Sequence, residues 1–130
     1  MYNANAAYAY KSNQNLSVMT ADPMKLVIMI YEGGLTNLKA SRGAILSNSI
    51  EKRNKFIYKS QDFIEELING LNFELGGEIS KNLYSLYEYF IWNLNMAIAK
   101  NSVEYVDTVI KNMEGLLSSW KQIYSESGRK

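Results

Sequence analysis

Histidine and cysteine are absent from the 130-residue chain, and proline occurs only once. Without an imidazole or a thiol, the sequence offers no usual side-chain ligand for zinc, haem or copper, and no Ser-His or Cys-His pair for nucleophilic catalysis. It also has no side chain whose unperturbed pKa lies near neutrality. These absences argue against an enzyme, and we expect the protein to work without a metal ion or other cofactor.

The chain also lacks an excess of either charge, because 14 Lys and Arg residues stand against 13 Asp and Glu residues. A protein that neutralises several nucleic-acid phosphates usually has a basic surplus, so the sequence predicts no nucleic-acid partner. The longest uncharged apolar run, Leu26 to Tyr31, is far too short to cross a bilayer, which argues against membrane insertion. With no secretory signal pattern and no disulfide, we expect the protein in the cytosol.

Apolar and aromatic residues are abundant instead, since hydrophobic residues make up 47% of the chain and include 10 Tyr, 4 Phe and 2 Trp. Residues 1–21 differ from the rest, because Asn, Ala, Ser and Tyr dominate and no apolar periodicity persists. Such a composition predicts a flexible N-terminal segment. The alternative is that this segment docks on an apolar surface through its hydrophobic side chains. They are Tyr2, Tyr8, Tyr10, Leu16 and Val18.

From residue 22 onward, apolar residues recur at helical spacing in four stretches. Asp22 is a good N-cap residue, and Pro23 occupies the first helical position, where its missing N–H costs nothing. A helix therefore begins there. The four predicted helices cover residues 23–46, 50–71, 78–100 and 102–124.

Short polar or glycine-rich breaks separate the predicted helices. Asn48 with Glu51, and Asn101 with Glu104, resemble capping boxes for the second and fourth helices. The paired glycines before Glu78 supply the backbone freedom for a tight reversal. Because such short breaks leave antiparallel neighbours as the simplest arrangement, the sequence predicts an all-α protein. The predicted fold is an antiparallel up-down-up-down four-helix bundle over residues 22–124, followed by a disordered tail at 125–130.

The second and third helices carry more apolar surface than a single bundle seam needs. Phe56 and Phe63 flank the seam of the second helix, while Tyr87 and Ile91 flank that of the third, with Tyr84 further round. This surplus is either flanking core, a surface under the N-terminal segment, a homo-oligomer interface, or a groove for a partner's amphipathic helix. Four amide side chains are also expected to face inward, where each needs a hydrogen-bond partner. They are Asn54, Gln61, Asn82 and Asn93.

Several short motifs follow one another along the chain. They are Thr20-Ala21-Asp22-Pro23, Ile30-Tyr31-Glu32-Gly33, Glu51-Lys52-Arg53-Asn54, Gly76-Gly77-Glu78-Ile79, Asn82-Leu83-Tyr84, Leu86-Tyr87 and Trp120. In this order and spacing, from Leu16 to Tyr124, the sequence resembles the flagellar secretion chaperones of the FliS family. Gly34 departs from the family pattern, in which alanine is expected, and we expect it to cost the first helix about 1 kcal/mol.

The resemblance implies a bacterial cytoplasmic export chaperone that binds the disordered C-terminal segment of flagellin in a one-to-one complex. Binding would prevent premature polymerisation and aid delivery to the flagellar type III export apparatus, with the export gate and a flagellin-linked regulator as further partners. The alternative is a structural bundle that forms a homo-oligomer through its surplus apolar face.

The resemblance also implies that the client displaces an N-terminal cap. The residues expected to form this cap are Tyr8, Tyr10, Leu16 and Val18. The residues expected to contact the client lie on the second and third helices and in the turn between them. They are Asn54, Phe56, Gln61, Phe63, Asn72, Asn82, Tyr84, Tyr87 and Ile91.

Overall fold

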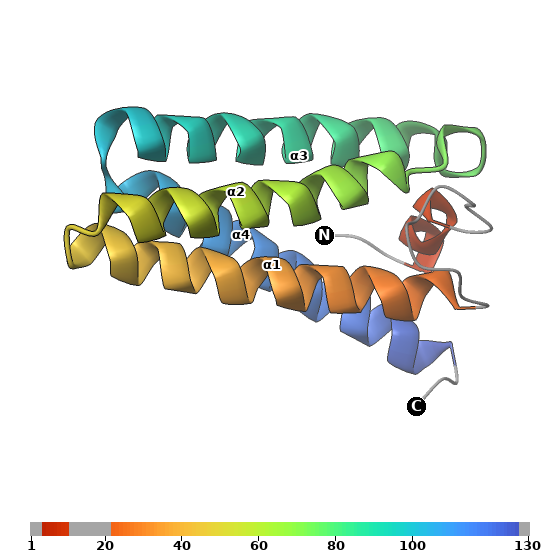
Figure 1. Cartoon of the computed structure of the whole chain (residues 1–130). Helices are drawn as coiled ribbons and strands as arrows, with labels where there is room; N and C mark the ends of the chain where they lie inside the picture. Colours follow the sequence, from red (N-terminus) through yellow and green to blue (C-terminus); the bar gives the residue numbers. More distant parts are fainter. Residues whose placement is uncertain (1–3, 11–21, 128–130) are drawn as a thin grey trace.

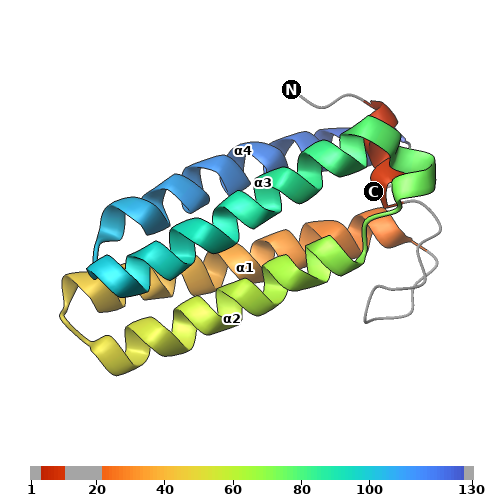
Figure 2. The same ribbon diagram turned by 90° about the horizontal axis from the view of Figure 1, so that it is seen from above.

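The computed structural model describes residues 4–10 and 22–127. Four long helices make up most of it: α1 (Pro23–Leu46), α2 (Ile50–Asn69), α3 (Phe73–Lys100) and α4 (Val103–Glu126). A short 3-10 helix, η1 (Ala4–Ala9), precedes them. The long helices alternate in direction and lie side by side (Figures 1 and 2), so the predicted antiparallel four-helix bundle is confirmed.

α1 and α3 lie diagonally across the bundle, because each of them packs against α2 and α4. A side-chain hydrogen bond from Gln61 Nε2 to Asn95 Oδ1, 2.8 Å long, links α2 to α3. Exposed ion pairs join α1 to α4, and each such pair contributes at most about 1 kcal/mol. They are Lys39 with Glu114, Arg42 with Asp107, and Lys121 with Glu32.

The helix starts differ in part from the predicted caps. Asp22 caps α1 as expected, because its Oδ1 accepts a hydrogen bond from the amide of the third helical residue at 3.4 Å. The two predicted capping boxes are wrong, since Ser49 and Ser102 are the N-cap residues of α2 and α4. Asn48 and Asn101 instead have left-handed backbone, with φ of 59° and 49°. Asparagine tolerates this conformation, so each one ends the preceding helix.

α3 begins at Phe73, earlier than the predicted start at 78. The Asn72 side chain caps this first turn by accepting a hydrogen bond from the Leu75 amide at 2.9 Å. Gly77 then interrupts the helix with φ of 50° and ψ of −124°, a conformation in which a Cβ would be strained. The first turn of α3, Phe73–Gly76, is therefore offset from the rest of the helix at the end of the bundle near η1 (Figure 1).

The core lies between the four helices, and Trp120 and Tyr87 are among its largest fully buried side chains. Of the amides expected to face inward, Asn93 is buried and donates a hydrogen bond to a carbonyl of its own helix at 2.9 Å. The expectation for Asn82 is wrong, because this side chain is exposed. It lies about 100° round the helix from Leu83, whose buried side chain marks the core face.

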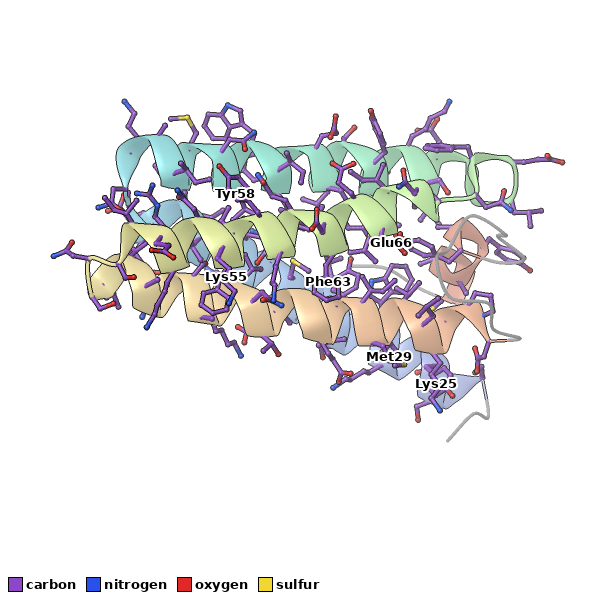
Figure 3. All side chains as sticks on the ribbon, in the orientation of Figure 1. Lys25, Met29, Lys55, Tyr58, Phe63 and Glu66 are labelled. Atoms are coloured by element: carbon purple, nitrogen blue, oxygen red, sulfur yellow. The ribbon has the colours of Figure 1, made fainter. Side chains whose placement is uncertain are left out.

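Gly33 and Gly34 lie on α1 opposite Phe63, which projects from α2 toward α1 (Figure 3). A Cβ added at Gly33 would lie 2.8 Å from the Phe63 ring, whereas one at Gly34 would meet Met113 Cε at 3.4 Å, an ordinary contact. Overpacking costs about 1–3 kcal/mol and the better helix propensity of alanine returns up to about 1 kcal/mol, so we expect Gly33→Ala to lower the free energy of unfolding by up to about 2 kcal/mol. Gly34→Ala should raise it by up to about 1 kcal/mol, because alanine is the better helix former. Urea denaturation measures both shifts, and shifts of the same sign would contradict this prediction.

Candidate functional site

η1 closes one end of the bundle. It lies where α2 turns into α3, at the opposite end from the α1–α2 turn (Figures 1 and 2), and it packs on α3. The side chains of Ala6 and Ala9 in η1, and of Tyr10 directly after it, are fully buried. We call residues 4–10 the N-terminal plug.

The Tyr10 hydroxyl joins a buried hydrogen-bond network. Its oxygen lies 2.9 Å from the Leu67 carbonyl oxygen of α2 and 2.9 Å from the Tyr87 hydroxyl of α3. The Tyr87 hydroxyl in turn lies 2.7 Å from the Tyr31 hydroxyl of α1. Leaving one buried hydroxyl unpaired costs about 1–3 kcal/mol. The network therefore stabilises the docked plug and all the helices that it joins.

The same tyrosines form an aromatic cluster with Trp120 of α4. The Tyr10 and Trp120 rings meet edge-on with centroids 5.8 Å apart, and the Tyr31 and Trp120 rings meet similarly at 6.3 Å. Aromatic pairs in this geometry contribute about 0.5–1.5 kcal/mol beyond the burial of their area. Tyr10 thus contacts α2, α3 and α4 directly, and its removal would open the core at this end.

Backbone contacts hold the plug against the first turn of α3. The Asn72 amide donates a hydrogen bond to the Ala9 carbonyl at 2.6 Å, and Ser80 Oγ donates one to the Asn72 carbonyl at 2.7 Å. A Cβ added at Gly76 would lie 2.8 Å from Ala9 Cα and would also collide with Ser80 Oγ. Gly76 is therefore needed because two backbones approach closely, whereas Gly77 is needed for its positive φ.

The residues predicted to form an N-terminal cap occupy different environments. Tyr10 is fully buried, and Tyr8 is 43% exposed. Leu16 and Val18 lie outside the described residues. Residues 4–10 take the docked arrangement that the composition left open as an alternative to flexibility. Their displacement by a partner stays a prediction.

The family model described as Flagellar protein FliS matches residues 4–127, a range that includes the plug and all four helices. The chain belongs to the FliS family. One relative, the flagellar secretion chaperone FliS of Campylobacter jejuni, is 35% identical over 122 residues, which cover 93% of each chain. The FliS chaperones of Vibrio cholerae and Salmonella typhimurium are 31% and 30% identical, over 91% and 95% of this chain and 88% and 93% of theirs. FliS relatives are thus named as secretion chaperones, and the family is not enzymatic.

The residues expected to contact a client in a FliS protein do not form one continuous group. Tyr87 is fully buried and bonded to Tyr10 of the plug, and Asn72 caps α3 and bonds the plug backbone. Tyr84 is exposed, and its ring contacts the exposed Phe73 ring with centroids 6.2 Å apart. Tyr84 is thus accessible at the plug end of α3, whereas Tyr87 is buried and bonded to Tyr10 of the plug.

The other predicted residues lie elsewhere on the two helices. Gln61 is half-buried and donates to Asn95, and Asn54 accepts hydrogen bonds from the buried Arg53 guanidinium at 3.0 and 2.9 Å. These amides already have partners within the chain. Asn82 is exposed on α3. The remaining members of the predicted set are half-buried, and they are Phe56, Phe63 and Ile91.

Three residues of the plug end were not among the predicted site residues. Tyr31 and Trp120 contribute rings that pack around the plug, and Gly76 permits its close approach to α3. All three belong to the motifs that carry the FliS resemblance, and this membership is the sequence feature that could have identified them as site residues. Their shared location could not be deduced, because they come from different helices.

Within residues 4–10 and 22–127, no group of three or more acidic side chains is arranged to hold a metal ion. None of the helices described there has the length and apolarity that a membrane crossing requires. The plug end offers aromatic rings, hydroxyl groups and backbone amides.

Proposed function

We propose that this chain binds the C-terminal segment of flagellin, one chaperone to one client, in the bacterial cytosol. Binding covers the client's polymerisation surface before export and aids delivery to the flagellar type III export apparatus, with the export gate and a flagellin-linked regulator as further partners. Membership of the FliS family supports this proposal, because the relatives are named flagellar secretion chaperones. The same names make the homo-oligomeric structural bundle the less favoured alternative.

The observation that carries the proposal is the buried position of Tyr10. This residue precedes the bundle in the chain, yet its ring and hydroxyl complete the core at one end. Because residues 11–21 separate it from α1, the plug can leave while the four helices stay intact. A client segment with an aromatic or aliphatic anchor fits the vacated place, in the way that amphipathic segments occupy helical grooves.

When a client replaces the plug, the free-energy cost of opening the site is small, because the client restores the lost contacts. Undocking the plug removes Tyr10 from the Leu67 carbonyl, the Tyr87 hydroxyl and the Trp120 ring. A client that places an apolar side chain and one polar atom there restores both the packing and the hydrogen bonds.

The plug site is too small to bind a disordered client alone, because ordering such a segment costs about 2–5 kcal/mol or more. We therefore expect the client to extend along α2 and α3 beyond the plug site. The residues proposed to contact it are Asn54, Phe56, Gln61, Phe63, Asn72, Asn82, Tyr84, Tyr87 and Ile91.

Calorimetric titration of the purified chain with full-length flagellin is expected to give a one-to-one complex. Flagellin that lacks its C-terminal segment should give no binding signal, because the proposed contacts all go to that segment. Equal binding of the two flagellins would contradict the proposal. Light scattering on the free chain provides the second measurement, since a stable oligomer that ignores flagellin would support the structural alternative.

A further inference from the structure

The outer surface of α3 carries two exposed aromatic rings, which meet a half-buried tyrosine of α4 at the edge of the core. The rings of Tyr89 and Trp92 lie nearly parallel, with an interplanar angle of 10° and centroids 6.3 Å apart. Tyr105 of α4 approaches Trp92 edge-on at 6.1 Å. Trp92 is nonetheless 52% exposed and Tyr89 is 47% exposed. We call Tyr89, Trp92 and Tyr105 the outer aromatic cluster.

Stability of the bundle does not account for this cluster. The core face of α3 is formed by other residues, among them Leu83, Phe90 and Leu94, which are fully buried. Half-exposed tryptophan and tyrosine rings gain little from burial, yet these residues dominate the binding free energy at protein interfaces. Their mutual contacts also hold Trp92 in one orientation, which lowers the entropy cost of binding a partner. The cluster therefore has the properties of a preorganised docking surface.

The charges around the cluster indicate the chemistry of its partner. Glu88 precedes Trp92 by four residues on α3, so the two share a helix face, and Glu104 lies in the first turn of α4, next to Tyr105 in the sequence. Both glutamates are exposed, and the ion pairs within the described residues include neither of them. The Glu88 carboxylate accepts only a long hydrogen bond, 3.4 Å, from the Tyr84 hydroxyl. α3 has no lysine or arginine between Lys81 and Lys100.

Aromatic faces beside an exposed carboxylate that forms no ion pair are complementary to a guanidinium group. An arginine side chain stacks on tryptophan and tyrosine rings and forms charge-assisted hydrogen bonds with carboxylates. Phosphate-bearing partners and anionic surfaces would instead meet repulsion. We infer that the outer aromatic cluster binds an arginine-bearing segment of a second protein.

This surface borders the proposed client contacts, because the Glu88 carboxylate accepts the hydrogen bond from Tyr84, but its aromatic rings lie on another side of α3. Trp92 lies about 80–100° round α3 from Tyr84 and Ile91, at 3.6 residues per turn. The hydrogen bond between Gln61 and Asn95 marks the side of α3 that faces α2, whereas the ring contact with Tyr105 joins α3 to α4. An arginine-bearing partner can therefore bind while flagellin occupies the other side, which adds a second interaction to the proposed function.

The test uses the full-length chain and three helical probes of 20 residues, built on alanine with arginine, glutamine or glutamate at every fourth position. Titration followed by the fluorescence of a dye on each peptide is expected to show that the arginine peptide binds at least tenfold more tightly than the glutamine peptide, and that the glutamate peptide does not bind.

Trp92→Ala should weaken binding of the arginine peptide at least tenfold. Tyr58→Ala, which removes a ring that is 54% exposed on α2, is the matched control and should change the affinity less than twofold. Glu88→Gln/Glu104→Gln should weaken binding severalfold and reduce its salt dependence.

Three kinds of result would overturn the inference. The first is a lack of specificity, seen either as equal affinity for the arginine and glutamine peptides or as equal losses in Trp92→Ala and Tyr58→Ala. The second is displacement of the arginine peptide by a flagellin C-terminal peptide, which would make the cluster part of the client site. The third is a dimer of the free chain that Trp92→Ala dissociates, which would make the cluster a contact between two copies. Circular dichroism of each variant confirms that it is folded, and the glutamate variant gives a second reading that does not depend on Trp92.

Discussion

Replacement of Tyr10 by alanine is expected to tighten flagellin binding while destabilising the free chain. Burial of the ring and its hydroxyl contacts predicts a loss of about 3 kcal/mol in the free energy of unfolding. If the docked plug occupies the client site, the apparent affinity is reduced by the fraction of molecules with the site open. A plug docked by about 3 kcal/mol leaves the site open in fewer than about one molecule in a hundred, so its loss should tighten binding about a hundredfold. Urea denaturation and calorimetric titration measure the two effects.

Tyr8→Ala is the matched control, because Tyr8 belongs to the same plug but is 43% exposed. It should change stability and affinity by less than about 0.5 kcal/mol each. The opposite signs of the two Tyr10 effects make the test specific. If Tyr10→Ala weakens both the fold and flagellin binding, Tyr10 is a permanent part of the core and the plug is not displaced.

A methyl group added at residue 76 should release the plug without changing any residue of it. The substitution is best made beside Ser80→Ala, which removes the collision with Ser80 Oγ and leaves Ala9 Cα, 2.8 Å from the new Cβ, as its closest contact. Overpacking of this kind costs about 1–3 kcal/mol, which exceeds the gain of up to about 1 kcal/mol from replacing glycine by alanine in a helix. Compared with Ser80→Ala alone, Gly76→Ala/Ser80→Ala is therefore expected to undock the plug and to bind flagellin more tightly.

Trp120 reports the undocking directly, because its ring contacts Tyr10 and is buried beneath it. The chain has 2 tryptophans, so a Trp92→Phe background leaves Trp120 as the sole tryptophan, whose emission is followed by selective excitation. Undocking should shift its emission to longer wavelength. Gly43→Ala serves as the control, since a Cβ there has no neighbour within 4 Å, and it should stabilise α1 without moving the emission. An unchanged spectrum and unchanged flagellin affinity in Gly76→Ala/Ser80→Ala would show that the close approach at Gly76 does not hold the plug.

The helices were predictable because their signals are local. α1 begins at Pro23 after the Asp22 cap, as the N-cap preference and the proline position indicate. The same kind of reasoning failed at Asn48 and Asn101, because asparagine suits both an N-cap and a left-handed helix end. Only the path of the chain beyond each residue distinguishes the two roles.

The candidate site was predictable in part. Tyr10 stood out because a disordered tail has no need of hydrophobic side chains, and its burial agrees with docking. Tyr87 was predicted to contact a client from its position beside the helix seam, but it is fully buried under the plug. Periodicity along one helix cannot show what a separate segment covers, so the sequence could not distinguish an open groove from an occupied one.

By itself, the sequence determined that the protein is an all-α bundle of the FliS type, and the lack of histidine and cysteine directed attention away from metal and nucleophile chemistry. Only the tertiary structure decided that Tyr10, Tyr31, Tyr87 and Trp120 share one cluster at the end of the bundle. The physical reason is sequence distance: the bond between Tyr10 and Tyr87 spans 77 residues, and helical periodicity shows which face of a helix is buried but not which turns of two helices lie level. The chain has few chemically reactive side chains, and its candidate site is accordingly built from packed aromatic rings and hydrogen-bonded tyrosine hydroxyl groups.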